Sequence, residues 1–194
     1  MPAGLQGHLR SNNISEKIAL LGWGSLLWDD SSEFDALHGD WQFDGPLLKI
    51  EFSRISDSRS GALTLVIDPQ NGVPVRVAYC LSKRPNISDV IEDIRKREKT
   101  ATRNIGYFCS TGKSRSSNQE SLESISGWAG DRDLNGVVWT DLPSNFEEKA
   151  GKPFTVANAV AYLQTRNEEA RAKAIDYFRR APDFVRTPLR DAQS

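Results

Sequence analysis

The sequence predicts a single α+β domain, built on a mixed, mostly antiparallel curled sheet or small partial barrel with flanking helices. Short apolar runs typical of buried strands are concentrated in residues 18–81, and helical periodicity becomes prominent only after them. This order does not alternate as a doubly wound sheet requires. The length of 194 residues is that of one domain with a sizeable core.

The strands are expected in the following order. Residues 1–16, rich in Gly, Ser and Asn, are expected to form a flexible tail, which leaves the domain over 17–194. Asp68–Gly72 is a strong turn signal, so the alternating segment 73–81 is expected to form a hairpin with the strand before it. The other strands are expected at 18–21, 46–52, 62–67, 105–109 and 136–139.

Helical spacing begins after Pro85, where Asn86 or Ser88 can cap a helix. A C-terminal helical segment is predicted over 155–181, with one break near Asn167. Residues 110–126 are polar and serine-rich, so we expect a mobile loop there with at most one marginal helical turn. A lid over a binding site is the alternative for this segment.

Composition excludes several classes of function. The 25 Lys and Arg against 26 Asp and Glu give a net charge of −1, which argues against nucleic acid or an anionic membrane as a partner. Two cysteines and two histidines lack zinc-ligand spacing, so no metal or cofactor is expected. The longest apolar stretch, Ile18–Trp28, is too short to cross a bilayer, and no secretory signal is visible. We therefore expect a cytoplasmic protein that acts on a small molecule; its oligomeric state is left open.

The first candidate site is Gly22-Trp23-Gly24-Ser25-Leu26, directly after the first predicted strand. Two glycines around a bulky residue allow successive backbone N–H groups to point at one anion, and the Ser25 hydroxyl adds a donor. The alternative is a plain turn packed by its tryptophans.

The second candidate is Glu98. The apolar positions Ile87, Ile91 and Ile94 advance by four and three residues, and a further four lead to Glu98 on the same helix face. Burial and the negative end of the helix dipole would raise the pKa of its carboxyl, as a proton shuttle at neutral pH requires. Two alternatives remain: the helix frays and exposes Glu98, or Arg95 pairs with it and lowers its pKa.

Arginines provide further candidates. Arg54 follows a predicted strand and could bind a substrate carboxylate through two hydrogen bonds, although a solvated strand end is the alternative. The cations between Arg95 and Arg103 could contact RNA, but the overall charge favours a solvated helix face.

Together these motifs resemble the gamma-glutamylcyclotransferase-like family. Leu21–Trp28 is similar to the glycine-serine loop near the start of that family, and Trp28 is similar to an extension typical of its glutathione-specific branch. Glu98, directly after Arg97, matches the position of the family's catalytic glutamate, and Tyr107 is the candidate for a strand tyrosine that follows it. The resemblance covers residues 18 to about 110, with 136–139 as a further family strand.

The resemblance implies a small barrel with a cavity at one end and release of 5-oxoproline from a gamma-glutamyl amide or dipeptide, without metal or cofactor. Glu98 would shuttle the proton. The substrate-binding residues would be Trp23, Gly24, Ser25, Leu26, Arg54 and Tyr107. Trp23 stands where the family usually has tyrosine, so a non-catalytic module that binds a metabolite in the same cavity is the alternative.

Overall fold

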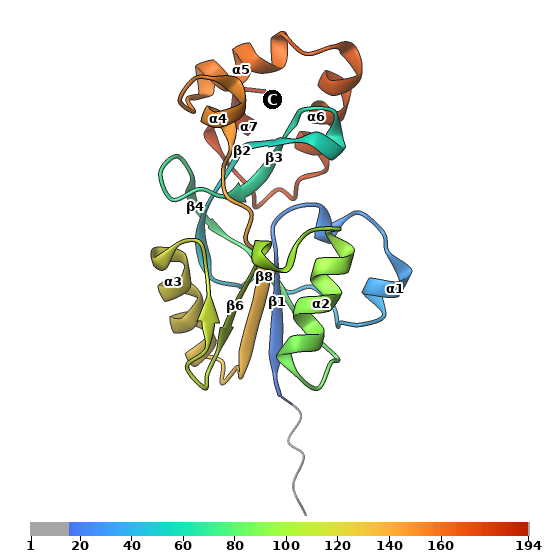
Figure 1. Cartoon of the computed structure of the whole chain (residues 1–194), viewed down its shortest axis with the longest axis vertical. Coiled ribbons are helices and arrows are strands. Elements are labelled where there is room, and N and C mark those ends of the chain that lie inside the picture. The colour runs from blue at the N-terminus through green and yellow to red at the C-terminus, as the bar shows by residue number, and fades with distance from the viewer. Residues whose placement is uncertain (1–15, 194) are drawn as a thin grey trace, which may run out of the picture.

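The computed structural model describes residues 16–193, which form an α+β fold with two sheets (Figure 1). The predicted tail at 1–16 therefore lies almost entirely outside the described residues. In the first sheet β1 pairs parallel with β8, and every other pair in both sheets is antiparallel. The α+β class and the mixed, mostly antiparallel pairing are thus confirmed. The strand order is β5 (Ala78–Leu81), β1 (Ile18–Gly22), β8 (Gly136–Thr140), β6 (Ile105–Cys109) and β7 (Ser114–Arg115) in one sheet, and β3 (Ala62–Ile67), β2 (Leu47–Ser56) and β4 (Val73–Arg76) in the other.

The predicted hairpin around residues 68–72 is wrong. Both β3 and β4 are antiparallel to β2, so they run in the same direction and cannot pair as a hairpin. The Asp68 carboxylate accepts hydrogen bonds from the amides of Gln70 and Asn71, and the Gly72 amide donates to the Asp68 carbonyl. These bonds close a compact loop that returns the chain to β2, with which β4 pairs. The second half of the predicted strand, β5, pairs instead with β1 in the other sheet.

Helix α2 (Ile87–Arg97) covers the five-stranded sheet beside α1 (Ser32–Asp35), as Figure 1 shows. The Asn86 side chain caps α2 by accepting from the amide of Asp89, as the sequence predicts. Val90 and Ile94 are fully buried against β1, β6 and β8. This packing fixes the position at which α2 ends.

The mobile loop predicted at 110–126 is also wrong. This segment contains β7 and the first part of α3 (Gln119–Gly130), which begins at an Asn118 cap. Ile125, Trp128 and Ala129 are buried on one face of α3, although two of them lie beyond the polar segment. Its serines donate to backbone carbonyls: the Ser126 hydroxyl donates to Glu123 within the helix at 3.1 Å, and the Ser124 hydroxyl donates to Leu47 of β2 at 2.7 Å. The polar composition therefore hid an amphipathic helix.

The C-terminal helices gather around the β2–β3 end of the molecule (Figure 1). The predicted break at Asn167 is confirmed, because its side chain caps α6 by accepting from the Ala170 amide. Within residues 16–193 no helix is long and apolar enough to cross a membrane. The C-terminal helices are α4 (Phe146–Ala150), α5 (Val156–Gln164), α6 (Glu168–Arg180) and α7 (Pro188–Asp191).

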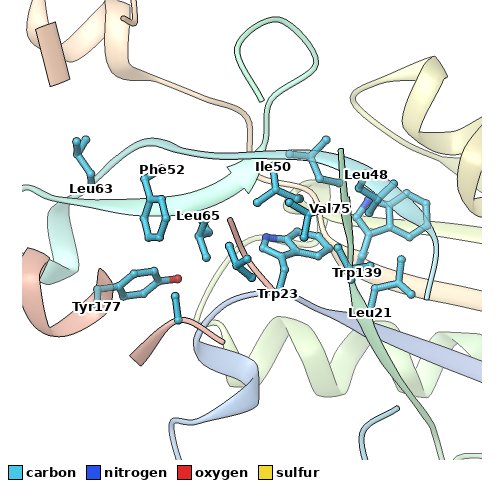
Figure 2. Close-up of a cluster of buried hydrophobic side chains, with 14 of the residues drawn as sticks. Leu21, Trp23, Leu48, Ile50, Phe52, Leu63, Leu65, Val75, Trp139 and Tyr177 are labelled. Carbon is cyan, nitrogen blue, oxygen red and sulfur yellow. The ribbon is translucent and has the colours of Figure 1, made fainter. Parts of the chain in front are cut away.

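One apolar core joins the two sheets to these helices (Figure 2). Trp139 from β8 and Phe52 from β2 are fully buried in it, and Tyr177 from α6 enters it from the helical side. The two sheets are therefore held at a common centre, and the loop after β1 lies at that junction.

Candidate functional site

A cavity of about 490 Å³ opens where the loop after β1 meets the end of α2, the β2–β3 hairpin and α6. Five cations and two carboxylates line it, so it suits an anionic ligand. The charged lining residues are Arg54, Arg59, Arg97, Lys99, Lys173, Asp29 and Glu98.

Glu98 is the C-cap residue of α2, directly after Arg97, and is held there by a regular helix end. The Thr100 amide donates to the Arg95 carbonyl and the Lys99 amide to the Lys96 carbonyl, both at 3.1 Å. This pattern is a Schellman motif, which needs a left-handed residue after the cap, and Lys99 supplies it with φ of 49°. Glu98 is therefore not a frayed, solvated end residue.

The Glu98 side chain lies in the cavity and is only 20% exposed. Its Oε1 atom has no hydrogen-bond partner among the described residues, and the Arg97 Nη1 atom lies 3.9 Å away. Burial raises the pKa of the carboxyl, and the charges of Arg97 and Arg59 oppose this rise. The alternative pairing with Arg95 does not form.

Arg95 instead binds Glu92, one turn back on α2, with a shortest contact of 2.7 Å. The Oε1 atom of Glu98 is therefore free to bind a ligand, and the Arg97 guanidinium lies near it without donating a hydrogen bond.

The loop after β1 forms a 3₁₀ turn over Ser25–Leu27. The amides of Ser25 and Leu26 lie at the start of this turn, where no carbonyl of the turn itself can accept them. Gly24 has a φ of −128°, so the loop does not use the left-handed glycine that an alternating anion nest requires.

The two glycines are required for close packing instead. A Cβ at Gly22 would lie 2.9 Å from the Trp41 ring, and a Cβ at Gly24 would lie 2.7 Å from the Tyr177 hydroxyl oxygen. The alternating anion nest predicted from these glycines is therefore not formed, and steric fit explains why both positions are glycine.

Trp23 turns its side chain away from solvent and is 5% exposed. Figure 2 shows its indole among Ile50, Leu65 and Val75 of the other sheet. Trp23 therefore packs between the two sheets and joins them.

Three arginines from three elements hold the loop after β1. Arg97 donates to the Asp29 carbonyl at 2.7 Å, and Arg59 binds the Asp29 carboxylate at 2.8 Å. Arg180 donates to the Trp28 carbonyl at 2.9 Å and lies 3.2 Å from Asp29. No local pattern marks these three arginines as site residues, because their common target forms only where α2, the β2–β3 hairpin and α6 converge.

Arg54 lines the cavity as predicted, and its guanidinium donates to the Pro143 carbonyl at 2.7 Å. Neither Arg54 nor Lys99 has a carboxylate within 4.0 Å in the described part of the chain. Lys173, by contrast, is paired with Glu169 at 2.6 Å. Two lining cations are therefore left to bind an anion from solution.

Tyr107 is the one predicted site residue that the structure does not bring to the cavity. It lies on β6, with the Arg115 guanidinium 5.3 Å from its ring centroid. Thr140, at the end of β8, lines the cavity instead, and its buried hydroxyl has no hydrogen-bond partner within residues 16–193. Across residues 16–193, no cluster of three or more His, Cys, Asp or Glu residues could hold a metal ion.

Comparison of the chain with protein-family models, curated proteins and solved structures finds no match.

Proposed function

We propose that the chain is a gamma-glutamylcyclotransferase-like enzyme, which releases 5-oxoproline from a gamma-glutamyl amide or dipeptide. The observation that carries the proposal is the buried, unpartnered Oε1 atom of Glu98 in a cationic cavity. The sequence resemblance concerns the same two segments, the Trp23–Leu26 loop and Glu98, and both line this cavity.

The reaction needs little from the protein, because nucleophile and electrophile belong to one substrate. The substrate's α-ammonium gives a proton to the Glu98 carboxylate, and the free amine attacks the γ-carbonyl carbon to close a five-membered ring. Glu98 then returns that proton to the leaving nitrogen as the C–N bond breaks. The ring nitrogen, still protonated after the attack, gives its extra proton to the freed amine, which leaves as an ammonium ion. Burial raises the pKa of Glu98, which makes its carboxylate a stronger base for the first step.

The cavity also suits the charge of such a substrate. Arg54 and Lys99, the lining cations without a carboxylate partner, are available for the substrate's carboxylates. The Leu26 amide at the start of the 3₁₀ turn can donate toward the γ-carbonyl oxygen as it gains negative charge.

The test measures 5-oxoproline release from glutathione, a gamma-glutamyl dipeptide and a gamma-glutamyl amine. We expect Glu98→Gln to lose at least about 100-fold in turnover, the usual contribution of a positioned acid–base group. Glu92→Gln is the matched control on the same helix, because Glu92 is solvated and paired with Arg95. It should retain activity.

The pH profile gives a second measurement on the same enzyme. The acid limb of kcat/KM should lie above the ordinary range of a glutamate pKa, because burial raises the pKa of Glu98. Turnover that survives in Glu98→Gln would refute the mechanism. Saturable binding of these compounds by the wild-type chain without 5-oxoproline release would favour the metabolite-binding alternative.

A further inference from the structure

Tyr177 reaches the loop after β1 from α6, a part of the chain that the family resemblance does not cover. Its side chain is 4% exposed and lines the cavity. Figure 2 shows its hydroxyl directed toward Leu65 and the Trp23 region. Tyr177 thus connects the C-terminal helices to the centre of the site.

Side chains from three parts of the chain pack against the Tyr177 ring. Its ring packs edge-on against Trp28, with centroids 5.1 Å apart, and against Phe52 at 6.0 Å. The Arg59 guanidinium lies 4.8 Å from the ring centroid. Because these neighbours come from the loop, β2 and the β2–β3 hairpin, the ring has little freedom to move away from the loop.

The hydroxyl group contacts the loop backbone itself. The backbone amides of Ser25 and Leu65 lie close enough to its oxygen to favour negative charge on it. Gly24 approaches so closely that a Cβ there would lie 2.7 Å from this oxygen, whereas the next nearest ring atom, Cζ, would be 3.9 Å away. The fit between Gly24 and Tyr177 therefore depends on one atom, the phenolic oxygen.

We propose that Tyr177 is a positioning residue, whose hydroxyl sets the position of the Gly24–Ser25 backbone in the cavity opposite Glu98. Burial raises the pKa of Tyr177 to about 12, so the hydroxyl stays protonated at neutral pH and does not compete with Glu98 for the proton. The catalytic consequence rests on the proposed function, but the effect on the loop does not.

Amide hydrogen exchange of Ser25 in Tyr177→Phe tests the contact directly. The substitution keeps the ring and removes the oxygen beside the Ser25 amide, so that amide should exchange about tenfold faster. The amide of Leu20 in β1 is an internal reference. Tyr162→Phe is the matched control, because the Tyr162 hydroxyl donates to the Gly61 carbonyl at 2.8 Å and lines a different pocket. It should leave Ser25 exchange unchanged.

A double-mutant cycle with Gly24→Ala tests the fit. In the wild-type background the added methyl meets the hydroxyl oxygen, so Tm should fall; in Tyr177→Phe the nearest Tyr177 atom is at van der Waals distance. The drop in Tm caused by Gly24→Ala should therefore shrink by about half or more in Tyr177→Phe. Equal drops in both backgrounds, together with unchanged Ser25 exchange, would overturn the inference.

Turnover separates this inference from the proposed function. If the chain releases 5-oxoproline, Tyr177→Phe should lower kcat about tenfold and change KM less than about threefold, because loop position matters most in the transition state. Unchanged kcat would remove the catalytic consequence. If the wild-type chain releases none, the proposed function fails, and the exchange and Tm measurements still decide whether Tyr177 positions the loop.

Discussion

Hydrogen bonds to the buried Glu51 carboxylate connect the C-terminal segment to β2, and we predict how much they contribute to the free energy of unfolding. Glu51 is fully buried on β2 and accepts from the Thr187 hydroxyl and the Phe52 amide, both at 2.7 Å. The Leu189 amide of α7 lies 3.4 Å from its other oxygen. Thr187→Val removes the hydroxyl and nearly keeps the side-chain shape.

The expected cost is about 2 kcal/mol near pH 8, the range for a hydrogen bond to a charged, buried group. For a chain of this length, that loss lowers Tm by about 4–8 °C. In urea it lowers the unfolding midpoint by about 1 M, for an m value near 2 kcal/mol/M.

The sign of the pH dependence follows from the pKa of Glu51. Burial raises the pKa in the folded state, and the Thr187 hydrogen bond is the main effect that opposes the rise. A carboxyl with a raised folded-state pKa makes the protein less stable as pH increases above the unfolded value. Loss of Thr187 raises the pKa further, so the destabilisation should be smaller at pH 5 than at pH 8.

Thr155→Val provides the matched control. Both threonines cap a helix by accepting a backbone amide, but only the Thr187 hydroxyl also donates to a buried carboxylate. Urea unfolding of both variants at pH 5 and pH 8 should give a cost of about 1 kcal/mol that does not change with pH for Thr155→Val. A pH-independent cost for Thr187→Val, or one below about 0.5 kcal/mol, would refute the reasoning.

Two further predictions concern backbone positions. A Cβ at Gly106 would overlap the buried Trp139 ring, so Gly106→Ala should lower the free energy of unfolding, measured in urea, by about 3 kcal/mol or more. At Gly127 in α3 the space is open, so Gly127→Ala should instead raise it by about 0.5–1 kcal/mol. Lys99 adopts a left-handed conformation with φ of 49°, so Lys99→Gly should raise the free energy of unfolding by about 1 kcal/mol while removing a cation from the cavity. Equal effects at Gly106 and Gly127, or no gain at Lys99, would contradict these assignments.

Local patterns predicted many of the elements. The first strand, the strand at 62–67, the capped helix after Asn86 and the break at Asn167 all depend on neighbouring residues, and all are confirmed. Helix α3 was missed because its buried positions extend past the polar segment, to Trp128 and Ala129. Its amphipathic face becomes visible only when the whole helix is considered.

Pairing between strands depended on information that no local pattern holds. The turn at 68–72 was recognised correctly, but the partner of the following strand was not, because β2 is long enough to pair with both β3 and β4. Similarly, Tyr107 matched a family position by order along the chain, yet it lies on β6 outside the cavity.

The sequence alone identified the candidates for the proposed chemistry: a glutamate in phase with a buried helix face, and a glycine-containing loop after a buried strand. Only the tertiary structure decided their environment, since desolvation, steric fit and ion pairing depend on groups distant in the chain. Glu98 and Tyr177, 79 positions apart, line one cavity because α2 and α6 converge on the same loop. The reason that Gly24 must be glycine is likewise found in α6, at Tyr177.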